Sequence, residues 1–333
     1  MASPLRLEPT EDTVHRLKEA IEGALYKEGV ELEIPIEYTG VTGFYDHNIK
    51  LNKIAYRAIE EFDLPLVRTW YKYGQFEPYA QLRPKVMEVG PQHNTEKYVY
   101  SGKKRTVTQG DVINFLVKQD LKGIFEDQDT FEFLIYNYDD LAPAEYKQTY
   151  YASTRIIEIL EDLAAIESPS ELNENIGSYR SEFKQASIDM RYELERNSAF
   201  DEEVRDHVEN YLLLFEDALV AFEDCSDADP SMVDDIKSSR QIYHEHVLPL
   251  IGLSISVKEV EGPDEDTEYY SEKGSDILKD KKKSANYQSR GWRETLEEIG
   301  LAPSIEAYRR VQSGEPGALD DLSNAAIDLD ERL

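Results

Sequence analysis

The chain has 333 residues, 40% of them hydrophobic, and its 22 Tyr and 11 Phe exclude an intrinsically disordered protein, which has few aromatic residues. It carries 68 Asp and Glu against 37 Lys and Arg, so its formal net charge is −31. This charge disfavours nucleic acid as a partner, because a phosphate backbone is bound through Lys and Arg.

The first 142 residues are predicted to form a helical domain with one β-hairpin. Apolar residues recur at helical spacing from Thr10 to Gly29 and again from Ile49 to Phe62. The segment 31–38 alternates apolar and acidic residues around a proline, which is typical of an edge strand or an extended arm. Residues 97–108, "KYVYSGKKRTVT", predict the hairpin, and Thr108 with Asp111 predicts a capping box on the next helix.

The segment 129–140, "DTFEFLIYNYDD", is ambiguous between helix and strand, because a short apolar run cannot be assigned from its period. From residue 143 to 255 the pattern is helical, with helices predicted at about 144–166, 178–197, 201–223 and 231–250. Short polar breaks between these long helices favour an antiparallel helical bundle. For residues 256–333 we expect an acidic linker followed by short helices. The predicted fold class is therefore mainly α with a small β-hairpin.

No motif in the sequence specifies a catalytic, metal or cofactor site. The patterns GxxxxGK[ST], GxGxxG and GxSxG do not occur, and the single cysteine, Cys225, excludes an internal disulfide. His244 and His246 are two residues apart, a spacing that points two helical side chains in nearly opposite directions. We therefore expect no catalytic residue, no metal and no cofactor, and we interpret these histidines as surface residues.

Residues 70–79 are the strongest indication of a binding surface. They contain five aromatic residues, and Gly74 with Pro78 predicts a tight turn among them. A more basic loop follows in the sequence. Rigid aromatic side chains with a basic rim are typical of interface hot spots, so we expect this set to bind a partner protein. Its members are Trp70, Tyr71, Tyr73, Phe76, Tyr79, His93, Lys97, Lys103, Lys104 and Arg105. The alternative is that the aromatic residues form a core and that the basic loop is a solvated hairpin tip.

The stretch "LNKIAYRAIEEFDLPLVRTWYKYGQFEPY", residues 51–79, resembles the signature of the Panacea domain, a SocA-like antitoxin family. Gln75 stands where that family has a proline, and the next proline is Pro78. The resemblance implies a helical interaction domain that neutralises a toxin by direct binding and has no catalytic residues. The matching positions are Leu51, Lys53, Ile54, Tyr56, Trp70, Tyr73 and Gly74.

We therefore expect a non-enzymatic protein-interaction module, antitoxin-like, with a toxin-like protein as its partner. The acidic excess runs along nearly the whole chain, which indicates a surface adapted to a salt-rich cytosol and hence a halophilic microbe. Without a signal peptide or a membrane span in the sequence, we expect a cytoplasmic location. Two alternatives stay open: a winged-helix-like nucleic-acid-binding regulator or defence protein with residues 97–108 as its wing, and an enzyme of unrecognised type that uses His47 or His93 in a cleft.

Overall fold

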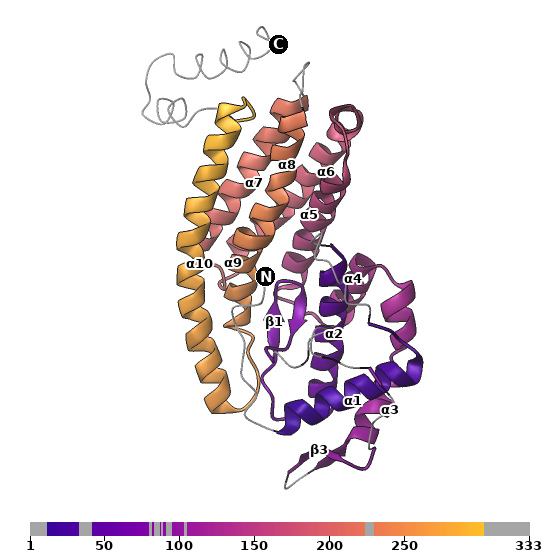
Figure 1. The fold of residues 1–333 in the computed structure, drawn as a ribbon. Helices are drawn as coiled ribbons and strands as arrows, with labels where there is room; N and C mark the ends of the chain where they lie inside the picture. Colours follow the sequence, from indigo (N-terminus) through magenta and orange to yellow (C-terminus); the bar gives the residue numbers. More distant parts are fainter. Residues whose placement is uncertain are drawn as a thin grey trace. The chain divides into compact units, whose positions relative to one another are not determined.

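The computed structural model describes residues 12–32, 42–79, 82, 87, 89–90, 95–102, 105–223 and 230–302, with the side chains of α2 described from residue 47 onward. These residues form a mainly α structure with two small antiparallel sheets, which confirms the predicted fold class (Figure 1). The chain divides into two compact units. Unit 1 comprises Met1–Ala142 with Gly252–Ile277, and unit 2 comprises Pro143–Ile251 with Leu278–Leu333. No helix in the described ranges is long and apolar enough to cross a membrane.

The N-terminal helices of unit 1 are α1 (Asp12–Glu28) and α2 (Thr42–Glu61), and α1 packs against α3 (Gln109–Val117). The predicted capping box is confirmed, because Thr108 and Asp111 exchange side-chain to backbone hydrogen bonds at the start of α3. A π-helical turn, η2 (Gly123–Asp127), follows, and then α4 (Thr130–Leu141). The ambiguous segment is thus a helix, and the Asp129 carboxylate accepts hydrogen bonds from the first backbone N–H groups of α4.

Two hairpins complete the N-terminal part of unit 1. The predicted hairpin is confirmed as β3 (Tyr98–Ser101) and β4 (Thr106–Thr108). A second, which the sequence indicated only as a turn, joins β1 (Thr69–Tyr71) to β2 (Gly74–Phe76). Gly74 has a φ of 86°, and a Cβ added there would lie 2.8 Å from a ring carbon of Tyr138, so glycine is required at this turn. Most of the predicted arm at 31–38 lies outside the described residues.

A C-terminal segment also belongs to unit 1 and contacts β1. Thr69 Oγ1 donates to the carbonyl of Ser256 at 2.9 Å, and the Ser256 hydroxyl lies 2.9 Å from that of Tyr270. Arg68 and Glu261 pair through their backbones and through an ion pair of 2.6 Å. These polar contacts join stretches of chain that are nearly 190 residues apart, and no local sequence pattern could have predicted them.

Unit 2 contains the predicted bundle helices as α5 (Lys147–Ala165), α6 (Pro169–Arg196), α7 (Glu202–Glu223) and α8 (Pro230–Ile242). The helices α5, α6, α7 and α8 lie side by side (Figure 1). A π-helical turn, η3 (Tyr243–Val247), separates α8 from α9 (Leu248–Ser256). The four predicted bundle helices are confirmed, except that α6 begins nine residues earlier than predicted and the last helix is divided by this turn.

The expectation of an acidic linker after residue 255 is wrong for the residues that the structure describes. They contain α10 (Asp264–Glu298), a single helix of 35 residues. Acidic residues in its first turn favour a helix start, because they face the positive end of the helix dipole. Its apolar positions are widely spaced but share one helical face, so the polar composition concealed the pattern; the buried members are Tyr270, Ala285, Trp292 and Leu296. Residues 303–333 lie outside the described part.

Candidate functional site

Three basic side chains lie on one face of α2. Lys50, Lys53 and Arg57 are separated by three and then four residues, which places them within a narrow arc of the helix. Lys50 is buried, Lys53 is only 2% exposed, and Arg57 is partly buried. Lysine is almost never fully buried unless it is paired, so this arrangement is unusual. We call these three residues the basic face of α2.

Both lysines donate a hydrogen bond to a backbone carbonyl group. Lys53 Nζ donates to the carbonyl of Gln75 at 2.7 Å, and Lys50 Nζ donates to that of Gln128 at 2.8 Å. Burial lowers the pKa of Lys53 well below its ordinary value, and the neighbouring charge of Arg57 lowers it further. Within the described residues, Lys53 makes no ion pair that would offset this cost.

Arg57 is held in a similar way by neutral oxygens. Its two terminal nitrogens donate to Oε1 of Gln119 at 3.1 Å and to Oδ1 of the fully buried Asn137 at 2.6 Å. Its Nε is buried without a hydrogen-bond acceptor, and burial lowers the pKa of the guanidinium. No carboxylate of the described residues forms an ion pair with Arg57.

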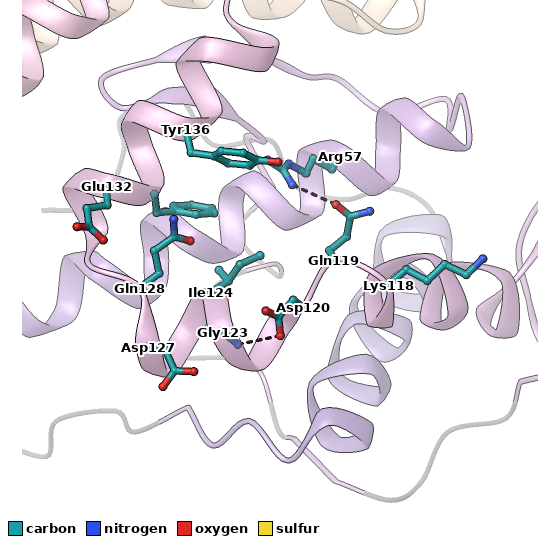
Figure 2. A pocket seen from close by; sticks show the side chains of 11 residues that line it. Arg57, Lys118, Gln119, Asp120, Gly123, Ile124, Asp127, Gln128, Glu132 and Tyr136 are labelled. Carbon is teal, nitrogen blue, oxygen red and sulfur yellow. Dashed lines mark hydrogen bonds between the residues drawn. The ribbon is translucent and has the colours of Figure 1, made fainter.

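A cavity of about 570 Å³ opens beside Arg57, between α2, η2 and α4 (Figure 2). The π-helical form of η2 shapes one of its walls, because Gln128 N donates to the carbonyl of Gly123, five residues earlier. Asp120 has a φ of 53° and accepts a hydrogen bond from Gly123 N through its carboxylate. A Cβ at position 123 would meet that carboxylate, which would then have to move away from Gly123. Such π-helical turns are frequent at functional sites.

The cavity combines two cations, Arg57 and the exposed Lys118, with an acidic rim. Its acidic side chains, Asp120, Asp127 and Glu132, are exposed, and none is in an ion pair with a described residue. Tyr136 is 54% exposed, and its hydroxyl end points toward Arg57 (Figure 2). The arrangement can bind a negative group on Arg57 while the rim attracts positive charge.

Comparison with known families places most of the chain in one of them. The model of a family described as a domain of unknown function (DUF8098) matches residues 79–327, about three quarters of the chain. The chain belongs to the DUF8098 family. The match includes the cavity residues of η2 and α4, and it begins after α2. Comparison with curated proteins found no match, and neither did comparison with solved structures.

The aromatic residues predicted to bind a partner lie mainly in the core of this DUF8098 protein. The predicted turn at Gly74 is confirmed, but Pro78 and most of the aromatic side chains are buried, and Tyr73 is partly buried. The rings pack in unit 1: that of Trp70 lies edge-on to Tyr56, with centroids 6.2 Å apart. The expectation of an exposed aromatic anchor is therefore wrong, because α2 packs on β2 and Gly252 of unit 1 lies against Tyr71. The buried members are Trp70, Tyr71, Phe76 and Tyr79.

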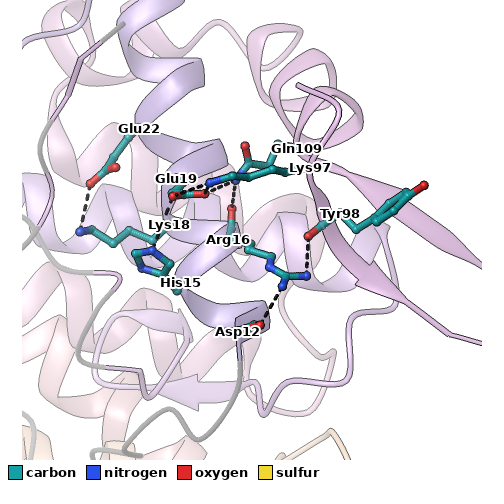
Figure 3. A network of polar contacts seen from close by, with 9 residues as sticks. All are labelled: Asp12, His15, Arg16, Lys18, Glu19, Glu22, Lys97, Tyr98 and Gln109. Carbon is teal, nitrogen blue, oxygen red and sulfur yellow. Dashed lines mark hydrogen bonds and ion pairs between the residues drawn. The ribbon is translucent and has the colours of Figure 1, made fainter. Parts of the chain in front are cut away.

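The basic loop contacts its own chain where the structure describes it. Lys97 Nζ lies 3.2 Å from Glu19 of α1, whose carboxylate also accepts from Gln109, so the hairpin is joined to α1 and α3 (Figure 3). The guanidinium of Arg105 lies 5.1 Å from the ring centroid of Phe62. These contacts give Lys97 and Arg105 structural roles. His93, Lys103 and Lys104 lie outside the described residues.

The expectation that His244 and His246 are surface residues is wrong for His244, which is buried beside Glu161 of α5, and His246 is partly buried. Glu161 lies 3.2 Å from His244, a close contact that is not aligned as a hydrogen bond, whereas the ring of His246 lies 3.4 Å from the hydroxyl of Ser284. The ring of His47 is tilted against Phe125 at 5.8 Å. Within the described residues, no group of three or more His, Cys, Asp or Glu side chains could hold a metal ion.

The basic face of α2 was not predicted from the sequence. The apolar spacing predicts that α2 is an amphipathic helix, and the polar side of such a helix normally faces water. The signal was nevertheless present, because three basic residues share that side in a chain where acidic residues dominate. Their burial depends on Gln119, Gln128 and Asn137, which lie more than 60 residues further along the chain.

Proposed function

We propose that this protein is a non-enzymatic interaction module that binds a partner protein at the η2 cavity, in the cytoplasm of a halophilic microbe. The observation that carries the proposal is the basic face of α2, where Lys53 and Arg57 are held by neutral oxygens and Arg57 lines the cavity. Desolvating a cation without an ion-pair partner costs stability, and at Arg57 the nearby charges of Asp140 and Glu60 offset only part of the effect of burial. A negative group of a partner would offset that cost, which makes the cavity the part of unit 1 best suited to binding.

The resemblance to the Panacea antitoxin family supports the same region. Lys53, Tyr56, Trp70 and Gly74 are among the matching residues, and Lys53 joins α2 to the β1–β2 turn through the carbonyl of Gln75. These residues would form the framework, and the adjoining cavity would recognise the partner. By this resemblance we propose antitoxin-like neutralisation of a toxin-like protein through direct binding.

The proposal is tested by capturing partners from the native host at high salt with tagged protein. We expect one protein to be enriched, and Tyr136→Ala and Arg57→Gln to reduce its recovery at least about tenfold, as for hot-spot residues. Tyr192→Ala is a matched control, because Tyr192 is 64% exposed on α6. Recovery of no protein, or equal losses from Tyr136→Ala and Tyr192→Ala, would contradict the proposal.

A further inference from the structure

We infer that the η2 cavity binds the C-terminal carboxylate of a basic polypeptide segment. The carboxylate would contact Arg57, and basic side chains of the same segment would lie beside the rim acids Asp120, Asp127 and Glu132. This inference rests on the proposed function and specifies the chemistry of the partner.

Arg57 is suited to a carboxylate because part of its donor capacity is unused. A guanidinium has five N–H donors, and the described contacts of Arg57 use two of them, to Gln119 and Asn137. These two bonds fix the plane of the group and leave N–H bonds on both terminal nitrogens. Arginine binds carboxylates through paired, charge-assisted hydrogen bonds, and a fixed orientation reduces the entropy lost on binding.

The negative charge of the rim limits which ligands can reach Arg57. Asp120, Asp127 and Glu132 are exposed, without ion pairs to described residues, and the whole chain carries a net charge of −31. Acidic segments and nucleic-acid phosphates would be repelled before they reached Arg57. A free C-terminus on a basic segment combines the negative group that Arg57 can bind with the positive charge that the rim attracts.

The size and openness of the cavity favour the end of a chain. A volume of about 570 Å³ lies within the range of ligand pockets. Small-molecule sites usually enclose their ligand, whereas here the rim acids and Tyr136 are exposed. A chain end can enter while the preceding residues extend over the rim. The Tyr136 ring offers a flat surface for the stem or the charge of a lysine or arginine side chain.

The test uses labelled short peptides and the full-length protein in fluorescence anisotropy titrations. A lysine-rich peptide with a free C-terminal carboxylate should bind at least about tenfold more tightly than the same peptide with a C-terminal carboxamide. Non-specific attraction to an acidic surface would favour the carboxamide, which carries one negative charge fewer. The predicted preference therefore has the opposite sign to a non-specific effect. A glutamate-rich peptide with a free carboxylate should bind least.

Substitutions in the cavity test whether the preference for the free carboxylate arises there. Arg57→Gln should make the carboxylate and carboxamide peptides bind equally, and Glu132→Gln should weaken the basic peptide about two- to fivefold. Glu209→Gln is the matched control, because Glu209 is an exposed carboxylate on α7. If Arg57→Gln fails to fold, the peptide comparison on the unmodified protein decides alone.

Equal binding of the two peptides to the unmodified protein, or a carboxylate preference that survives in folded Arg57→Gln, would overturn the inference. Failure here is distinguishable from failure of the proposed function. A partner whose capture depends on Tyr136, together with peptides that show no carboxylate preference, would reject this inference alone. Absence of any captured partner would reject the proposed function.

Discussion

Buried cations in unit 2 face carboxylates, whereas Lys53 and Arg57 in unit 1 are held by neutral oxygens. In unit 2, Arg240 lies 2.6 Å from Glu161, and Lys282 lies 2.6 Å from Asp201. The hydrogen bonds of Lys53 and Arg57 run to a backbone carbonyl and to side-chain amides, and neither residue has an ion pair in the described part of the chain. Lys53 and Arg57 thus lack the carboxylate that offsets the desolvation cost of Arg240 and Lys282.

Whether a buried cation has a carboxylate partner indicates whether its role is in folding or in binding. A carboxylate beside a buried cation offsets part of the desolvation cost, so such pairs can be explained by folding alone. When only neutral oxygens hold a cation, less of its desolvation cost is offset. A site that lowers the stability of the fold in this way is typical of a functional site. The comparison predicts that substitutions in the two units will affect stability and binding in opposite proportions.

The largest effect on stability is expected from Glu161→Gln. This change leaves Arg240 and His244 without the carboxylate that they share, so the free energy of unfolding should fall by about 3 kcal/mol. Denaturant unfolding at high salt measures it. Glu209→Gln, on an exposed carboxylate of the same unit, should stay within about 0.5 kcal/mol of the unmodified protein. If Glu161→Gln lost no more stability than Glu209→Gln, the carboxylate of Glu161 would not stabilise the fold by pairing with Arg240.

Substituting Arg240 and Arg57 compares an arginine that is paired with a carboxylate and one that is held by neutral oxygens. Arg240→Met should lower the free energy of unfolding by about 2 kcal/mol, because it breaks a charge-assisted contact with Glu161. Arg57→Met should cost less than about 1 kcal/mol, because removing a desolvated cation offsets the donors lost by Gln119 and Asn137. The same denaturant series compares both. Equal losses would show that Arg57 is as structural as Arg240.

Lys53 should give the stability of the protein a dependence on alkaline pH. Its pKa is lowered in the folded state, so between that value and the ordinary value the unfolded chain binds more protons. Stability therefore rises with pH across this window, by up to about 1.4 kcal/mol per pH unit. Lys53→Met should flatten that part of the profile, whereas Lys122→Met, at an exposed position, should not. An unchanged slope in Lys53→Met would mean that the lysine is not strained by burial.

The smallest effect on stability is expected from Tyr136→Ala. Tyr136 is more than half exposed, so the free energy of unfolding should change by less than about 0.5 kcal/mol. Partner capture should nevertheless fall, which would separate binding from folding at this position. Thermal unfolding of the purified variant, measured beside the capture experiment, checks both. A large loss of stability would assign Tyr136 to the core and remove it from the site.

The elements that could be predicted from the sequence are those determined by residues close together in the chain. The capping box of Thr108 and Asp111, the turn at Gly74 and the helices α5 to α8 depend on residues close together in the chain. Local patterns could not show which surfaces are covered. Lys53 is on the polar side of an amphipathic helix, and Trp70 is in a short aromatic run, yet distant segments bury both.

The candidate site was less predictable than the fold. Lys53 is one of the positions that match the family resemblance, whereas no sequence pattern singled out Arg57. Its acceptors, Gln119 and Asn137, are neutral, so no complementary charge pattern could reveal the contact. The cavity also depends on the π-helical turn η2, which has no simple sequence period.

The central claim is that the η2 cavity receives a protein partner, and photo-crosslinking in the native host tests it most directly. A photoreactive amino acid, p-benzoylphenylalanine, replaces Tyr136 in one chain and the more exposed Tyr192 in another. The account predicts one dominant crosslinked protein from position 136, joined near its own C-terminus, and no such product from position 192. No product from position 136, or the same products from both positions, would contradict it.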